Sequence, residues 1–132
     1  MHRALAAFNL SIQDARSLTI LYDFLKASVR TPFPYDDLLR SQIVYSVGAF
    51  DKLIHELIRI GMVATFMGTR PATAKYKAEP ISIQFHGTLV AATIPPKEIL
   101  FEQEIGRKLS TLTFQDPEKV SDGLAYIWGE KH

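Results

Sequence analysis

One long stretch of helical periodicity, residues 36–62, constrains the fold of this chain more than any other feature. Its apolar side chains lie on or beside one face of a helix: Ile43, Val47, Phe50, Ile54 and Ile58. Asp36 and Asp37 precede them, where a carboxylate can cap the helix and favour its positive end. We therefore predict a helix from Asp36 or Asp37 to about Met62 or a little beyond.

Residues 4–29 are predicted to form an earlier helix. Their apolar side chains recur at three- and four-residue spacing: Leu10, Ala15, Leu18, Leu21, Tyr22 and Leu25. The segment RTPFPY ends this helix, because the residue before a proline is pushed away from helical backbone angles. In the second helix, Gly48 and Gly61 favour helix least, and Gly48 would also let another helix approach closely.

Two shorter helices are expected after residue 95. The first carries an apolar stripe at spacings of four, four and three: Phe101, Ile105, Leu109 and Leu112. The second begins at Asp116 as N-cap, with Pro117 at the first helical position. Its apolar face comprises Val120, Leu124, Ile127 and Trp128. The final residues, WGEKH, give no clear closing signal, which suggests a fragment or a shortened member of a longer family.

Residues 65–96 are the least regular part of the sequence. Glycine and proline interrupt them at six positions: Gly68, Pro71, Pro80, Gly87, Pro95 and Pro96. The segment ISIQF alternates apolar and polar residues as a strand does, but it has no obvious partner strand. We expect an irregular loop with a short helical turn, and hence an all-α chain.

Composition limits the classes of partner and chemistry. Hydrophobic residues make up 47% of the 132 residues and charged residues 22%, which is typical of one globular domain. The net charge of +1 demands neither a nucleic acid nor a membrane partner. Without cysteine there is no thiolate nucleophile or cysteine-based zinc site, as suits a cytoplasmic protein. Charged residues interrupt the longest apolar region, so we expect no membrane span.

Three polar residues line one edge of the stripe in the predicted helix 36–62: Arg40, Asp51 and His55. Asp51 and His55 are four residues apart and can touch, and a carboxylate beside an imidazole suits general acid–base chemistry. Arg40 lies roughly 16 Å from Asp51 along the axis, so a joint role would need another helix or a second chain. Spacing alone favours the alternative, in which Asp51 and His55 are a surface pair and Arg40 borders the stripe.

The segment FMGTRPATAKYK holds a small basic and aromatic cluster. Its candidates for contacting RNA phosphate are Arg70, Lys75 and Lys77, although the sequence favours an ordinary solvated loop. His86 is expected to be a solvated loop residue. Neither a glycine-rich nucleotide motif nor a metal-binding histidine motif is present, so we expect no metal and no cofactor.

The segment DDLLRSQIVYSVGAFDKLIHELI resembles the second helix of HEPN-domain proteins, specifically the RiboL-PSP-HEPN branch. Arg40, Asp51, His55 and Glu56 match the layout of that helix. The segments TAKYKAEPISI and LSTLTFQDPEKVSDGLAYI resemble the same branch in the same order, so the resemblance covers about residues 5–128. It implies one HEPN-like domain over residues 1–132, built as an up-and-down bundle of about four helices.

The resemblance also implies partners and an activity. Many HEPN proteins are dimeric, metal-independent ribonucleases of toxin–antitoxin, phage-defence or RNA-processing systems, so we expect a homodimer, with RNA and an antitoxin-like protein as further candidate partners. Their catalytic motif is an arginine followed five to seven residues later by a histidine on the last helix. No histidine of this chain has an arginine at that spacing, so no catalytic residue is transferred. The helix-two set of Arg40, Asp51 and His55 is transferred only as supporting residues.

Three functions therefore remain in competition. The chain is a HEPN-like domain of an RNA-cleaving lineage, without catalysis of its own, or a non-catalytic dimerising or regulatory helical module. A small-molecule or nucleotide-binding bundle is the third interpretation.

Overall fold

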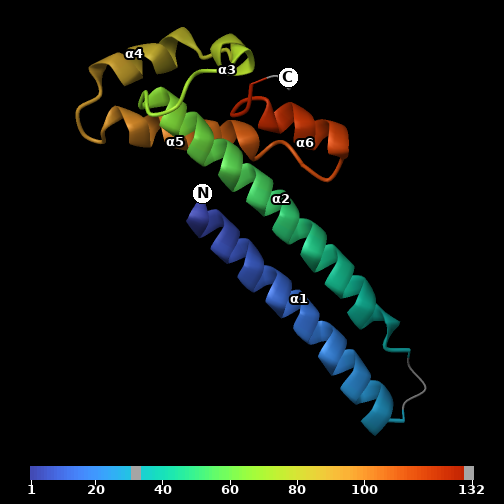
Figure 1. Ribbon diagram of the computed structural model, residues 1–132. Helices are drawn as coiled ribbons and strands as arrows, with labels where there is room; N and C mark the ends of the chain where they lie inside the picture. Colours follow the sequence, from blue (N-terminus) through green and yellow to red (C-terminus); the bar gives the residue numbers. More distant parts are fainter. Residues whose placement is uncertain (31–33, 130–132) are drawn as a thin grey trace. The chain divides into compact units, whose positions relative to one another are not determined.

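The computed structural model describes residues 1–30 and 34–129, and within them the chain forms six helices and no strand (Figure 1). The helices are α1 (His2–Ser28), α2 (Asp36–Phe66), α3 (Ala74–Ala78), α4 (Ile83–Ala91), α5 (Lys97–Leu109) and α6 (Pro117–Leu124). The expected all-α class is confirmed. None of the helices in these two ranges has the length and apolarity needed to cross a membrane.

The chain divides into two compact units, Met1–Leu53 and Ile54–His132. In the first unit, α1 and the N-terminal part of α2 run side by side in opposite directions (Figure 1). The second unit holds the rest of α2 together with the four shorter helices. The segment RTPFPY, predicted to end the first helix, includes residues 31–33, and the final segment WGEKH includes residues 130–132. These six residues lie outside the described part of the chain.

In the first unit, α1 buries little of its apolar surface. Only Ala4 and Ala15 are buried along it, with exposed fractions of 7% and 1%. Leu18, Tyr22 and Leu25 of the predicted stripe are half-buried. Leu10 and Leu21, placed in that stripe from the sequence, are exposed instead, because they lie at the edge of the stripe that is farthest around the helix from the buried Ala15.

The region 65–96 is more helical than expected. It contains α3 and α4, and each begins with a hydroxyl cap: Thr73 accepts a hydrogen bond from the Tyr76 amide, and Ser82 accepts one from the Phe85 amide. The prediction of an irregular loop was wrong there, because ISIQF reads as a strand although Ser82 starts a helix within it. The exposure expected for His86 is confirmed, on α4 rather than in a loop.

The core of the second unit is one apolar cluster from α2, α4, α5 and the segments around α6. Its buried members are Ile54, Ile58, Met62, Leu89, Phe101, Ile105, Leu109, Phe114 and Ile127. The first three positions of the predicted α5 stripe are therefore confirmed. Leu112 is 46% exposed because α5 ends at Leu109, and Trp128, on the predicted apolar face of the last helix, is 49% exposed.

Two glycines let the elements of this core approach closely. A Cβ atom at Gly61 would lie 2.8 Å from the Cβ of Ile127, and one at Gly123 would lie 2.8 Å from Cδ1 of Ile58. Among residues 1–30 and 34–129, no atom outside the adjacent turns of α2 lies within 4 Å of a Cβ built at Gly48. The close approach expected at Gly48 is therefore not found among these residues, and the close contact is at Gly61 instead.

Exchanging the two α2 glycines for alanine separates packing from helix propensity. Gly61→Ala should lower the free energy of unfolding by about 1–3 kcal/mol, because the new methyl group overpacks against Ile127. Gly48→Ala should raise it by about 0.5–1 kcal/mol, because alanine favours helix and meets no neighbour. Chemical denaturation followed by circular dichroism measures both variants; equal effects would contradict the packing of Gly61.

Candidate functional site

Arg40 lies on an exposed part of α2, within the first unit. Its guanidinium pairs with the Asp37 carboxylate one turn earlier, at 3.1 Å, and both side chains are more than three-quarters exposed. Exposed pairs of this kind contribute little to stability. Arg40 is eleven residues from Asp51 on the same helix, roughly 16 Å, so the helix keeps them apart as predicted.

Asp51 and His55 lie one turn apart on α2, and both are half-buried. The His55 ring meets the Phe114 ring edge-on, with centroids 4.7 Å apart. Phe114 is only 2% exposed, so His55 borders the core of the second unit. This placement agrees with a packing role for His55 at the edge of the stripe.

Arg59 joins two helices of the second unit through carboxylates. It donates two hydrogen bonds to Glu56, at 3.3 and 2.5 Å, and pairs with Glu102 of α5. These side chains are each about one-third exposed. The cluster therefore fixes α2 against α5 at the rim of the core, which is a structural role.

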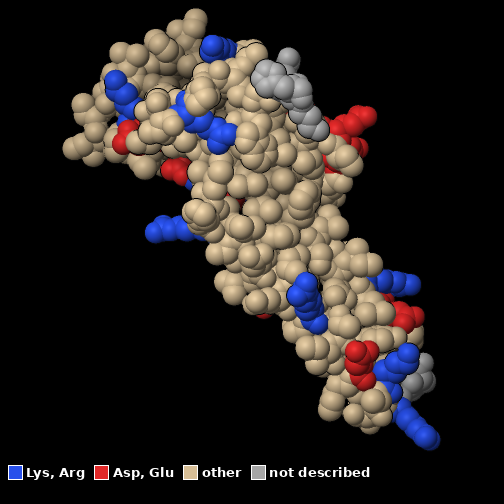
Figure 2. Space-filling model, viewed as in Figure 1, with Lys and Arg blue, Asp and Glu red and all other residues tan. Residues whose placement is uncertain are grey.

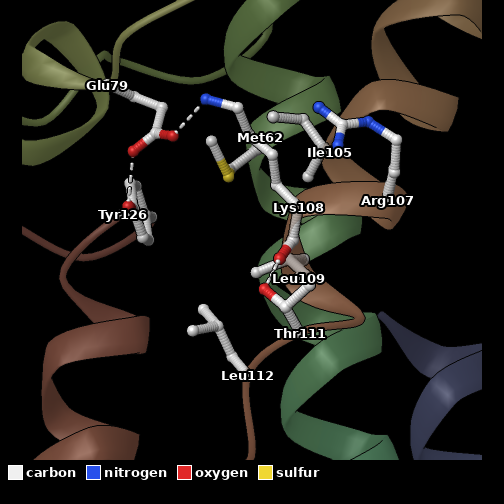
Figure 3. A pocket seen from close by; sticks show the side chains of 9 residues that line it. All are labelled: Met62, Glu79, Ile105, Arg107, Lys108, Leu109, Thr111, Leu112 and Tyr126. Atoms are coloured by element: carbon white, nitrogen blue, oxygen red, sulfur yellow. Dashed lines mark hydrogen bonds and ion pairs between the residues drawn. The ribbon is translucent and has the colours of Figure 1, made fainter.

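The best-developed polar cluster of the second unit is centred on Glu79 (Figure 3). One carboxylate oxygen of Glu79 accepts a hydrogen bond from Lys108 Nζ at 2.6 Å, and the other accepts one from the Tyr126 hydroxyl at 2.6 Å. Lys108 also donates to the Pro80 carbonyl. The cluster thus links three segments that are far apart in the sequence.

Lys75 extends this cluster towards α6. Its ammonium group lies 4.6 Å from the centroid of the Tyr126 ring and pairs with the Asp122 carboxylate. It also donates to the Asp122 carbonyl at 2.9 Å, and Thr73 donates to the Tyr126 carbonyl at 3.1 Å. Lys75 is therefore engaged in the fold, whereas Lys77 is exposed.

Arg70, the third basic candidate, is half-buried in the turn that follows α2. The three basic candidates thus differ in exposure. One is held by a carboxylate and an aromatic ring, so the segment does not form a row of equivalent exposed cations. Phosphate binding by these residues stays a prediction.

The contacts of Glu79 shift the acidity of its neighbours. Burial raises the pKa of Glu79, but hydrogen bonds from Lys108 and Tyr126 and the charges of Lys108 and Lys75 outweigh it and hold the pKa below 4.5. For Tyr126, burial, the hydrogen bond to Glu79 and the charges of Glu79 and Asp122 all raise the pKa. At neutral pH Glu79 is therefore ionised and Tyr126 is protonated. The Tyr126 hydroxyl thus donates a hydrogen bond to Glu79 and does not act as a base.

A pocket of about 360 Å³ lies beside this cluster. Its lining residues all belong to the second unit: Met62, Glu79, Ile105, Arg107, Lys108, Leu109, Thr111, Leu112 and Tyr126. Across residues 1–30 and 34–129, no group of three or more histidine, aspartate or glutamate side chains could hold a metal ion. The pocket offers apolar contact and the positive charges of Arg107 and Lys108, whereas the hydroxyl proton of Tyr126 is already donated to Glu79.

The sequence pointed to only one member of the cluster, Lys75. Lys108 and Tyr126 are 29 and 47 residues from Glu79, and no local pattern pairs residues across such distances. Tyr126 itself is half-buried. The only local signal is Thr73, a hydroxyl residue that begins α3 and so positions Lys75.

Comparison with known proteins adds no relative: no family model, no curated protein and no solved structure matches the chain.

Replacing Glu79 should reveal the contribution of the cluster through pH. Because the pKa of Glu79 is lower in the folded chain than in the unfolded chain, its stabilisation is complete above pH 4.5 and is lost as the pH falls through the folded pKa. Glu79→Gln should lower the free energy of unfolding by about 1–3 kcal/mol at pH 7.

The difference between Glu79→Gln and the parent should shrink steadily below pH 4.5. Asp23→Asn, an exposed carboxylate on α1, should change the free energy of unfolding by less than about 0.5 kcal/mol. Urea denaturation between pH 3 and 7 measures these values. A constant difference at every pH would show that Glu79 acts by packing alone.

Proposed function

We propose that this chain is a non-catalytic helical interaction module that pairs with a second copy of itself through one face of α1. The observation that carries the proposal is an exposed apolar face on that helix. Its large side chains are Leu10, Ile20, Leu21 and Phe24, with exposed fractions of 63%, 70%, 44% and 61%. We call these four residues the outer face of α1.

The outer face of α1 is also free of charge. At about 100° per residue its four members fall within an arc of roughly 100°, and the other residues of that arc from Ala6 to Ser28 are small or polar and uncharged. In the view of Figure 2, large parts of the surface of the two long helices likewise carry no charged side chain. A solvated helix normally places charged residues on its outer side.

A second copy is the occupant that this face suits. An uncharged face meets its own two-fold copy without like-charge repulsion, which is the requirement for an isologous interface. Four such side chains offer on the order of 400 Å² per copy, about half of the roughly 800 Å² that one partner buries in a standard interface. Two helical hairpins paired in this way would form a four-helix bundle.

The HEPN-like lineage belongs to the same proposal. The resemblance rests on α2, with Arg40, Asp51 and His55 as supporting residues, and the family's usual dimer and up-and-down bundle agree with pairing through α1. A cytoplasmic protein of a toxin–antitoxin, defence or RNA-processing system, with RNA or an antitoxin-like protein as a further partner, is what the lineage suggests.

A charge placed on the outer face of α1 should separate the two copies. The parent chain should have twice the 14.9 kDa mass in size-exclusion chromatography with light scattering. Phe24→Glu should weaken dimerisation at least about tenfold, because it buries an unpaired carboxylate.

Asn9→Glu provides the matched control, since it adds the same charge to an exposed position of α1 outside the outer face. It should remain dimeric, and both variants should keep the helical circular dichroism of the parent. A parent chain that is monomeric at every concentration would contradict the proposal, as would equal behaviour of the two variants.

RNA cleavage is the second candidate function. The observation that favours it is the position of His55, half-buried beside Phe114 with Asp51 one turn earlier on α2. A histidine can act as a general acid or base in RNA cleavage, and the Phe114 ring fixes the position of this one. The absence of an arginine five to seven residues before any histidine argues against catalysis by this chain.

A ribonuclease assay distinguishes the two candidates. The purified chain, incubated with single-stranded RNA and a metal chelator, should leave the RNA intact, because no histidine of the sequence has an arginine five to seven residues before it. The control is the His55→Ala variant under the same conditions. RNA cleavage by the parent that the His55→Ala variant loses would overturn the non-catalytic proposal.

A further inference from the structure

The pocket beside Glu79 has an apolar floor that is suited to an apolar ligand. Met62, Ile105 and Leu109 line it and are at most 5% exposed, so they are fixed by the core of the second unit. Leu112, which follows the end of α5 in the sequence, also lines the pocket and is 46% exposed. Apolar surface on both a fixed floor and an exposed lining residue favours a ligand with an apolar body.

The charged lining of the pocket is asymmetric. Arg107 and Lys108 carry positive charge, and Glu79 is the single carboxylate among the lining residues. Glu79 and Lys108 are already paired with each other, and the Tyr126 hydroxyl donates to the same carboxylate. Arg107 is therefore the positive side chain of the lining that does not pair with another lining residue.

Arg107 is placed so that an anion can reach it. Its side chain is 70% exposed and pairs with Glu104, which is outside the lining, through Nε and Nη2. Nη1 of Arg107 is not used in that pair. In Figure 3, Arg107 and Glu79 lie on opposite sides of the pocket, so an anionic group near Arg107 would be kept away from the Glu79 carboxylate.

From these features we infer that the pocket binds a small molecule with an apolar body and one anionic group. The apolar body lies over Met62 and Leu109, and the anion accepts a hydrogen bond from Arg107. The Glu79–Lys108 pair bounds the polar side of the pocket. The volume of about 360 Å³ falls in the range of small-ligand pockets.

Three probes test this inference on the full chain. The first, 1-naphthoate, has an apolar body and one carboxylate. The second, 1-naphthamide, has the same body without charge, and the third, acetate, has the charge without the body. In titrations followed by amide NMR shifts, 1-naphthoate should give saturable changes confined to residues 105–112 and the neighbourhood of Tyr126. Naphthamide should bind about 3- to 10-fold more weakly, and acetate should give no saturable change.

Two variants locate the ligand in the pocket. Arg107→Ala should weaken 1-naphthoate binding about 3- to 10-fold and leave naphthamide binding unchanged, because only the charged contact is lost. Leu112→Glu should abolish the binding of both, because it places a carboxylate on the apolar lining. Arg16→Ala, which removes an exposed arginine from α1, is the matched control and should change neither.

Several results would overturn the inference. One is the absence of saturable shifts with 1-naphthoate, and another is equal binding of the charged and uncharged naphthalenes. Shifts confined to residues of α1 would show that the probe binds another apolar surface. Because Arg107 and Leu112 lie outside the outer face of α1, the oligomeric state of these variants stays that of the parent, and the outcome is independent of the proposed dimer.

Discussion

The second unit depends on the close contact between Gly61 of α2 and Ile127, which follows α6. Only a residue without a side chain fits there, because a Cβ at Gly61 would lie 2.8 Å from that of Ile127. Gly123, four residues earlier in the chain, likewise has no Cβ and so lets the backbone approach Ile58 closely. Together these contacts fix the backbone on both sides of Tyr126, whose hydroxyl then reaches Glu79 at 2.6 Å. The polar cluster around Glu79 therefore depends on the close packing that Gly61 and Gly123 permit in the core.

The pocket exists because α5 ends where it does. Ile105 and Leu109 face the core, and Lys108 lies on the boundary of the same helix, where its ammonium group reaches Glu79. After Leu109 the chain leaves the helix, so Leu112 no longer continues the buried stripe and lies 46% exposed beside the polar cluster. The charged side chain of Lys108 and the exposed side chain of Leu112 therefore line the same pocket. This arrangement would be lost if α5 continued for another turn.

Sequence patterns within a few residues predicted those parts of the fold that helix geometry and capping determine. The extent of α2, the start of α6 at Asp116 and the separation of Arg40 from Asp51 all follow from helix geometry and capping. The helix α4 was missed because ISIQF alternates as a strand does and Ser82 was not recognised as a helix cap. The pairing of Glu79 with Lys108 had no local signal, since the packing of the whole second unit brings them together.

A single apolar stripe on α2 shows why sequence alone leaves the function open. Ile54 and Ile58 are buried within the second unit, whereas Ile43 and Val47, on the same side of the helix, are 66% and 39% exposed. The periodicity of a sequence shows that one face of a helix is apolar, but it does not show whether other parts of the same chain bury that face. The outer face of α1 presents the same contrast. The uncovered apolar surface of these two long helices is the observation on which the proposed pairing of two copies rests.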